Sequence, residues 1–336
     1  MKSWKRSIAA VLLTGLAAQI GVARADDKLT IQLKWVTQAQ FAGYYVAREK
    51  GFYKNAGLDV VIKPGGPDTA PEQVIAGGGA DVIVDWMPAA LAAREKGEKL
   101  VNIAQFFQKS AQETICRKDS GITTPADFKG KTIGVWFGGN EYPFLTWMNK
   151  LHYSYDGAHP DVILLKQGFN VDPLLQKQAD CIAAAVYNEY YQIIESGQFK
   201  AGDLVTFKWQ DQGVGLLEDG LYTTEDKLRD PKMLAALGRF VKASIKGWEY
   251  AQGHQAEAVD IILKNDTTGA QTRQHQTTQM AEIAKLLDGN PKGFGYLDPQ
   301  DYERTVGILR ENKVLNAEPK GAWTHKVFDA AAADKS

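Results

Sequence analysis

The sequence has few of the residues, and none of the motifs, on which most enzyme active sites depend. Its 336 residues include only two cysteines and five histidines, which are scattered along the chain. There is no GxSxG, HExxH or CxxC motif, so no pattern predicts a nucleophile elbow or a zinc site. The phosphate-binding motifs GxxxxGK[ST] and GxGxxG are also absent. We therefore expect no catalytic residue, no metal and no cofactor.

The scarcity of cysteine leaves one structural question open. Cys116 and Cys181 are the only two cysteines in the chain. In an oxidising compartment they can form one disulfide, but spacing alone does not show whether their Cα atoms come close enough. Neither cysteine has a histidine nearby in the sequence, which does not favour nucleophilic catalysis.

The sequence has no excess of basic residues either. The chain carries 39 basic and 40 acidic residues, for a formal net charge of −1. No basic run interleaved with aromatic residues occurs, so the composition argues against a nucleic-acid partner. The length suits two domains of ordinary size with substantial cores.

The N-terminus contains the one long apolar run, at residues 8–22. It follows Lys2, Lys5 and Arg6 and ends in Ala-Arg-Ala, so residues 1–25 have the pattern of a signal peptide cleaved after Ala25. The run is short for a membrane span and two acidic residues follow it at once. We expect a periplasmic protein with no stable membrane insertion after cleavage.

Beyond residue 25 the hydrophobic pattern alternates between strand and helix periods, which is typical of an α/β fold. Predicted strands cover residues 29–35, 58–62, 81–86, 100–106, 113–117, 131–136, 161–165, 181–187 and 204–207. Predicted helices cover residues 41–50, 69–76, 88–96, 141–151, 171–177, 188–196, 239–250 and 256–263, and the chain beyond residue 216 has a mostly helical pattern.

Two α/β series in succession predict two lobes that close on a ligand and are linked by two crossover segments. Lobe 1 would comprise residues 26–112 and 215–336, including the C-terminal helices. Lobe 2 would comprise residues 113–214. The hinge candidates are residues 111–118 and 208–214.

Aromatic and polar side chains gather where the predicted strands end. In open α/β sheets, ligands bind beyond the carboxyl ends of the strands. Aromatic rings there can pack on a planar ligand, with a pair worth about 0.5 to 1.5 kcal/mol beyond area burial, while carboxylates and amides can bind its polar edge. The alternative is that the aromatic residues fill the lobes and the carboxylates cap helices. The candidate ligand-binding residues are Trp35, Gln38, Gln40, Tyr44, Asp85, Trp86, Trp136, Asn140, Asn170, Tyr187, Asn188 and Glu189.

Four segments together resemble one known family: residues 35–63, GGAD at 78–81, KGKTIGV at 129–135 and GFN at 168–170. They are similar to the family shared by thiamine pyrimidine synthase and the periplasmic binding proteins for thiamine pyrimidine precursors. The resemblance implies a type II-like periplasmic-binding-protein fold with a ligand cleft between the lobes. It also implies a small heteroaromatic ligand and, as partners, an ABC permease with its ATPase. We expect the receptor to be a monomer.

The two branches of this family differ at positions that can be compared here. The synthase branch holds pyridoxal phosphate on a lysine, has a histidine four residues later and carries a cysteine-rich metal-binding run. The matching positions are Asp85, Ala89 and residues 212–216, which contain no cysteine. An aspartate cannot form a Schiff base, so the resemblance favours the non-enzymatic transporter branch over a pyridoxal phosphate-dependent synthase.

The receptor branch also has a pattern from which this sequence departs. Its usual Trp-Phe-Pro-Asn-Pro-x-His run is WVTQAQF at residues 35–41, so Phe41 stands in place of the histidine. Phe41 would widen a stacking surface for a larger ring such as a flavin. A thiamine pyrimidine precursor is the first choice of ligand, and riboflavin or another flavin, or an anion of the sulfonate or nitrate type, are the alternatives.

Overall fold

The protein is described here by a computed structural model that covers residues 26–168, 170–287 and 291–333. The predicted signal peptide, residues 1–25, lies outside the described residues, as does Phe169 of the GFN segment. In the described residues no helix is both long and apolar enough to cross a membrane.

The first of two five-stranded sheets, sheet A, contains the N-terminal strands. Its order is β2-β1-β3-β10-β4. Strands β2 and β3 pair with β1 in parallel, while β10 runs antiparallel to both of its neighbours. The strands are β1 (Asp27–Gln32), β2 (Leu58–Lys63), β3 (Val82–Asp85), β4 (Leu100–Gln105) and β10 (Gly220–Thr224).

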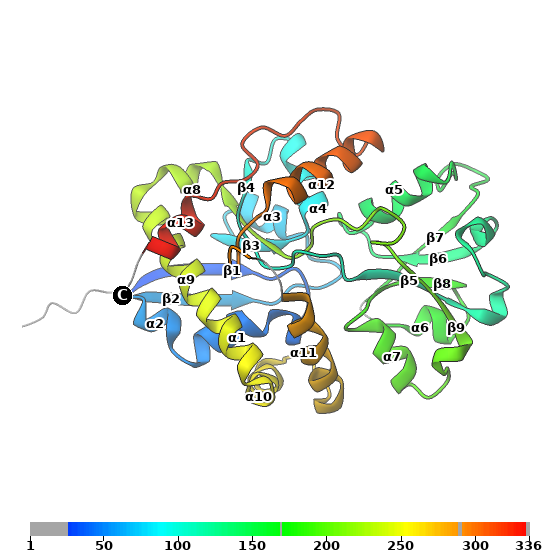
Figure 1. Ribbon diagram of the computed structural model, residues 1–336, viewed down its shortest axis with the longest axis horizontal. Coiled ribbons are helices and arrows are strands. Elements are labelled where there is room, and N and C mark those ends of the chain that lie inside the picture. The colour runs from blue at the N-terminus through cyan, green and yellow to red at the C-terminus, as the bar shows by residue number, and fades with distance from the viewer. Residues whose placement is uncertain (1–25, 169, 288–290, 334–336) are drawn as a thin grey trace, which may run out of the picture.

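The second sheet, sheet B, repeats the same plan. Its order is β7-β6-β8-β5-β9, with β6 parallel to β7 and β8, and β5 antiparallel to β8 and β9. Figure 1 shows sheet A in the left part of the molecule and sheet B in the right part. The strands are β5 (Gln112–Arg117), β6 (Thr132–Val135), β7 (Ile163–Lys166), β8 (Cys181–Ala185) and β9 (Leu204–Lys208).

Helices cover the sheets. The predicted helix start at Pro88 is confirmed, whereas the helix predicted at 239–250 begins earlier, at Pro231. Pro71, Pro88, Pro231 and Pro299 stand in the first turn of a helix, where the missing N–H costs nothing. The helices are α1 (Ala42–Glu49), α2 (Phe52–Asn55), α3 (Pro71–Ala76), α4 (Met87–Glu95), α5 (Tyr142–Lys150), α6 (Asp172–Leu175), α7 (Glu189–Glu195), α8 (Glu225–Arg229), α9 (Pro231–Gly253), α10 (Gln255–Asn265), α11 (Arg273–Leu287), α12 (Pro299–Glu311) and α13 (Lys326–Ala333).

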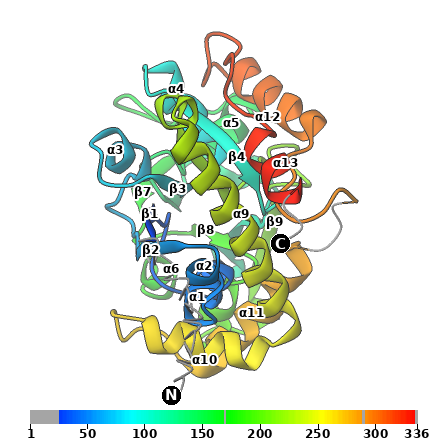
Figure 2. The same ribbon diagram turned by 90° about the vertical axis from the view of Figure 1, so that its left-hand side faces the viewer.

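The long helix α9 packs across α1 at two glycines. A Cβ at Gly43 would collide with the ring of Trp248, and a Cβ at Gly247 would collide with the backbone of Gly43. Only glycine at these two positions lets the helices approach so closely. Figure 2 shows α9 running beside α1 and α2, with α13 on its other side.

The chain crosses between the sheets twice, through residues 106–111 and 209–219. The hinge predicted at 111–118 is therefore largely wrong, because residues 112–117 form the fully buried strand β5. The hinge predicted at 208–214 coincides with the start of the second crossover. The domain limits at 112/113 and 214/215 stay predictions, although the change of sheet occurs close to both.

Glu218 ties the two crossovers together. Its carboxylate accepts hydrogen bonds from Ser110 Oγ at 2.6 Å, Ala111 N–H at 2.8 Å and Gln112 Nε2 at 3.1 Å. Burial raises the pKa of Glu218 to about 8, against the opposing effect of these bonds. A carboxylate in the second crossover thus holds the backbone of the first.

Strand β10 was missed by the sequence analysis, which predicted mostly helix beyond residue 216. The strand has only five residues, GLYTT, and four of them are buried. A short strand that is covered on both faces lacks the alternation by which strands are recognised. The correction matters because β10 occupies the interior of sheet A, between β3 and β4.

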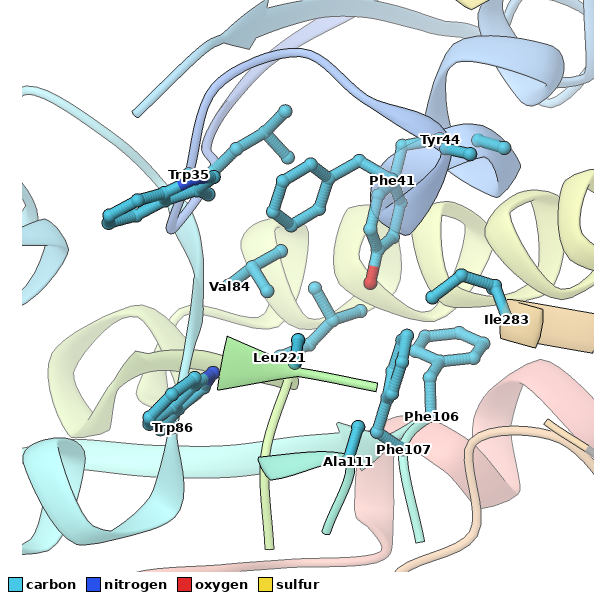
Figure 3. Close-up of a cluster of buried hydrophobic side chains, with 14 of the residues drawn as sticks. Trp35, Phe41, Tyr44, Val84, Trp86, Phe106, Phe107, Ala111, Leu221 and Ile283 are labelled. Atoms are coloured by element: carbon cyan, nitrogen blue, oxygen red, sulfur yellow. The ribbon is translucent and has the colours of Figure 1, made fainter. Parts of the chain in front are cut away.

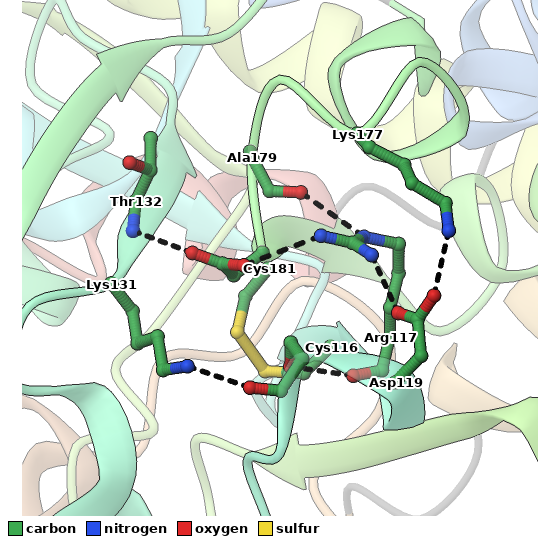
Figure 4. Close-up of polar contacts among 10 residues, drawn as sticks. Cys116, Arg117, Asp119, Lys131, Thr132, Lys177, Ala179 and Cys181 are labelled. Atoms are coloured by element: carbon green, nitrogen blue, oxygen red, sulfur yellow. Dashed lines mark hydrogen bonds and ion pairs between the residues drawn. A yellow bond between two sulfur atoms is a disulfide. The ribbon is translucent and has the colours of Figure 1, made fainter.

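A disulfide joins Cys116 and Cys181, which resolves the question that spacing left open. The two residues lie opposite each other on the paired strands β5 and β8. Next to the bridge, Arg117 pairs with Asp119 at 2.5 Å and with Asp180 at 3.2 Å (Figure 4). This end of sheet B is therefore held by a covalent bond and a charge cluster.

Candidate functional site

A cavity lies between the two sheets. The part of the molecule that contains sheet A, called lobe 1 from here on, supplies residues that follow β1 and β3. The part that contains sheet B, called lobe 2, supplies Gln112 at the start of β5, Ala185 at the end of β8 and residues that follow β6 and β8. This is the position expected for a ligand site in a fold of this type. The lining residues are Lys34, Trp35, Gln38, Gln40, Trp86, Gln112, Trp136, Asn140, Ala185, Tyr187, Asn188 and Glu189.

Two tryptophans meet across the cavity. Trp35 from lobe 1 packs edge-to-face on Trp136 from lobe 2, with 5.9 Å between ring centroids and 69° between ring planes. Trp136 is held from behind, because its Nε1–H donates to the Gly168 carbonyl at 2.9 Å. Both rings are almost fully buried. The lobes are therefore in contact in this structure, and both indole rings line the cavity.

Asp219 orients two side chains on the lobe 1 side. Its carboxylate accepts from Gln40 Nε2 at 2.6 Å and from Trp86 Nε1 at 2.9 Å. Gln40 in turn accepts from Gln38 Nε2 at 2.7 Å. Burial raises the pKa of Asp219 to about 6, although both of its donors lower it. The sequence analysis did not select Asp219, because it precedes the strand that was missed.

A buried ion pair lies at the end of β3. Lys34 Nζ is 2.6 Å from Asp85 Oδ1, and neither side chain is more than 3% exposed. Burial lowers the pKa of Lys34, but the charges of Asp85 and Glu72 outweigh that effect and hold it above its ordinary value. The sequence analysis found no amine at the position of the synthase lysine. The structure places one, Lys34, beside that position as an ammonium paired with Asp85.

Glu189 supplies the buried carboxylate on the lobe 2 side. It accepts from Ala185 N–H at 2.8 Å and from Asn188 Nδ2 at 2.6 Å. Burial raises the pKa of Glu189 to about 7, and these hydrogen bonds only partly offset that effect. The side chain is fixed at the first turn of α7 and contributes acceptor oxygens to the cavity.

Two further acceptors lack a hydrogen-bond partner among the described residues. They are Gln112 Oε1 and Asn140 Oδ1, which are buried and belong to side chains that line the cavity. A buried oxygen left unsatisfied costs about 1–3 kcal/mol. A ligand that brings N–H or O–H donors to these oxygens would recover that free energy.

Nine of the twelve candidate ligand-binding residues line this cavity, and three do not. Tyr44 is buried in the lobe 1 core, where it packs on Phe106 and Trp248 at 6.0 and 5.7 Å. Asp85 lies behind the wall with Lys34, and Asn170 lines a neighbouring cavity. The placement of Tyr44 at the cavity was therefore wrong, because α1 turns that face toward the core. Ligand binding by the other nine stays a prediction.

Phe41 also differs from the expectation that it widens a stacking surface. Its side chain is fully buried in the main hydrophobic cluster of the molecule. Figure 3 shows Phe41 beside Tyr44 in that cluster, with Trp35 at the upper left and Trp86 at the lower left of the view. The replacement of histidine by phenylalanine thus changes the core under the cavity and not the lining.

The fold is that of the periplasmic binding proteins. A ligand-binding component of an ABC-type import system from Staphylococcus aureus has a similar structure, with a TM-score of 0.66 at 12% identity over 91% of this chain and 99% of that one. The expected fold class is confirmed.

Sequence comparison then gives the family. Residues 38–258, more than half of the chain, match the NMT1/THI5-like family model, and the chain belongs to that family. The formylaminopyrimidine-binding protein of Halalkalibacterium halodurans is 26% identical over 92% of this chain and 94% of its own length. The 4-amino-5-hydroxymethyl-2-methylpyrimidine phosphate synthase THI11 of Saccharomyces cerevisiae is 29% identical over 53% of this chain and 51% of its own length. The predicted resemblance is confirmed, and both of its branches are represented.

Proposed function

We propose that this protein is the periplasmic solute receptor of an ABC importer and that it binds an aminopyrimidine related to the thiamine precursors. The observation that carries the proposal is the pairing of aromatic walls with an excess of hydrogen-bond acceptors. Trp35 and Trp136 provide the walls, while Glu189, Gln112 and Asn140 provide acceptor oxygens. An aminopyrimidine offers a flat ring and exocyclic N–H donors, which suit both features.

The relatives support this choice of ligand and transport role. The formylaminopyrimidine-binding protein covers almost the whole chain, whereas the yeast synthase aligns with about half of it. Delivery to a permease with its ATPase accounts for a fold in which two lobes close on a solute. We place the receptor in the periplasm as a monomer, following the predicted signal peptide at residues 1–25.

An anion of the sulfonate or nitrate type does not suit this cavity. Of the described residues that line it, Lys34 is the cation, and its charge is already paired with Asp85 at 2.6 Å. Glu189 adds a carboxylate on the opposite side. A bound anion would face this carboxylate without an unpaired cation, which is unfavourable at low dielectric.

An enzymatic role requires a free amine for pyridoxal phosphate, and Lys34 does not provide one. Its ammonium is buried in an ion pair that raises its pKa, so the nucleophilic form is suppressed. We expect no cofactor absorbance to remain with the protein after incubation with pyridoxal phosphate and gel filtration. Retained absorbance that the Lys34→Met variant loses would favour the synthase alternative instead.

The proposed function is tested by a thermal-shift panel. It compares 4-amino-5-hydroxymethyl-2-methylpyrimidine, its formylaminomethyl analogue, riboflavin and an alkanesulfonate. A true ligand at about 100 times its dissociation constant stabilises the fold by roughly 2.7 kcal/mol, which is readily detected. We expect a shift with the pyrimidines and none with the sulfonate. A shift with the sulfonate alone would contradict the proposal.

The Trp35→Ala variant locates the site in the same assay. Removing the ring that faces Trp136 should abolish the pyrimidine shift. Trp323→Ala is the matched control, because Trp323 packs on Tyr302 and His325 away from the cavity. If both variants keep the shift, the ligand binds elsewhere.

A further inference from the structure

A second cavity adjoins the first. Gln38 lines both cavities. The cavities also meet at a hydrogen bond, because Asn188 Oδ1 in the first lies 2.8 Å from His275 Nε2 in the second. The second cavity is lined by Val36, Gln38, Asn170, Gln192, Glu195, Ala270, Gln271, Thr272 and His275.

The lining of the second cavity is polar but nearly free of unpaired charge. Most of its polar side chains are amides, joined by the hydroxyl of Thr272. Its carboxylate, Glu195 Oε2, already lies 2.9 Å from His275 Nδ1. Amides and hydroxyls both donate and accept hydrogen bonds, so this lining suits neutral groups of the same kind. A phosphate would meet the Glu195 carboxylate instead of a free cation.

Both parts of the molecule build this cavity. Gln38 follows β1 and His275 lies on α11, whereas Gln192 and Glu195 lie on α7. Helices α7 and α11 are joined by the contacts of His275 and by Tyr191 Oη, which donates to Glu282 at 3.1 Å. A group bound here would contact both lobes at once. It would therefore bind the closed arrangement more tightly than an open one and shift the population toward the closed state.

We propose that the second cavity is a subsite for a neutral, hydroxylated or amide-bearing substituent that leaves the ring of the ligand past Gln38 and Asn188. The inference rests on the proposed function, since the ring occupies the first cavity. The natural ligand then carries a side chain longer than a hydroxymethyl group. Ring recognition and side-chain recognition are divided between two adjacent cavities.

The test measures affinity by calorimetry for four pyrimidines that share the 4-amino-2-methyl ring. Their 5-substituents are hydroxymethyl, formylaminomethyl, gluconoylaminomethyl and the phosphate ester of hydroxymethyl. We expect the polyhydroxylated gluconoyl compound to bind at least tenfold more tightly than the hydroxymethyl compound. We expect no gain from the phosphate.

The variant Ala270→Phe fills the second cavity from an exposed position, so the core is untouched. It should remove the tenfold gain and leave affinity for the hydroxymethyl compound unchanged. Ala256→Phe is the control, because Ala256 is also exposed but lies on α10 outside the cavity. This control should change neither affinity.

The outcomes separate the two proposals. Equal affinity for all four pyrimidines, or an equal loss for all of them in Ala270→Phe, overturns the second subsite and leaves the proposed function standing. A gain with the phosphate overturns the assignment to neutral groups. Failure of every pyrimidine to bind overturns the proposed function itself, and the second subsite with it.

Discussion

At the scale of single residues, the cavity depends on groups that its ligand does not need to touch. Asp219 holds Gln40 and the indole of Trp86, and Asp85 holds Lys34. No pattern in the sequence points to Asp219, because a carboxylate before a glycine is common in turns. Its partners lie 133 and 179 positions away along the chain. Sequence patterns predicted the residues that line the cavity better than they predicted the residues that hold those side chains in place.

Replacing Asp219 by alanine should weaken ligand binding without removing any lining side chain. Gln40 Nε2 and Trp86 Nε1 would lose their shared acceptor, at a cost of about 1–3 kcal/mol for a buried unsatisfied group. We expect at least a tenfold loss of pyrimidine affinity by calorimetry, together with a lower Tm. Exposed Asp211→Ala is the control. Unchanged affinity in Asp219→Ala would show that Asp219 does not position the lining.

At the scale of elements, the sequence analysis succeeded where the hydrophobic pattern was long and regular. The strand predicted at residues 58–62 is present as β2, and α1 ends at Glu49, just before Gly51, which adopts a φ of 75°. The sequence analysis failed where tertiary contacts, and not the local hydrophobic pattern, decide the structure. Strand β10 and the first predicted hinge are the two examples. Phe41 and Tyr44 show the same limit, because the face of α1 that meets the core depends on where α9 packs.

The disulfide between β5 and β8 should contribute strongly to the stability of lobe 2. It joins cysteines separated by 65 positions, and closing a loop of that length in the unfolded chain stabilises the fold by roughly 4 kcal/mol. We expect reduction, or the Cys116→Ser, Cys181→Ser double variant, to lower the free energy of unfolding by about that amount in urea titrations. Identical midpoints with and without reductant would refute this expectation.

At the scale of the whole molecule, the two lobes touch beside the cavity at a glycine. A Cβ on Gly139 in lobe 2 would lie 2.5 Å from the Cβ of Ala89 at the start of α4. That distance is too short for two carbon atoms, so any side chain here would hold the lobes apart. Ala89 is also the position at which the synthase branch has its histidine, and here it serves as a contact surface for the other lobe.

The variant Gly139→Ala should therefore hinder closure. Gly138→Ala is a matched control, because both glycines have positive φ, at 96° and 80°, but a Cβ on Gly138 meets nothing within 4 Å. We expect Gly139→Ala to lose at least tenfold more pyrimidine affinity than Gly138→Ala. Small-angle scattering with ligand should show the larger radius of gyration for Gly139→Ala. Equal behaviour of the two variants would exclude a closure effect at this contact.

The position of β10 also determines when sheet A can finish folding. It lies between β3 and β4, yet the chain reaches it only after all five strands of sheet B. During synthesis, which starts at the N-terminus, β3 and β4 are therefore made before β10. The edges that they present to β10 stay unpaired until residue 224 has been made. Such late closure makes folding slow and leaves open strand edges prone to association. Premature compaction of the first hundred residues would trap a sheet that lacks one of its interior strands.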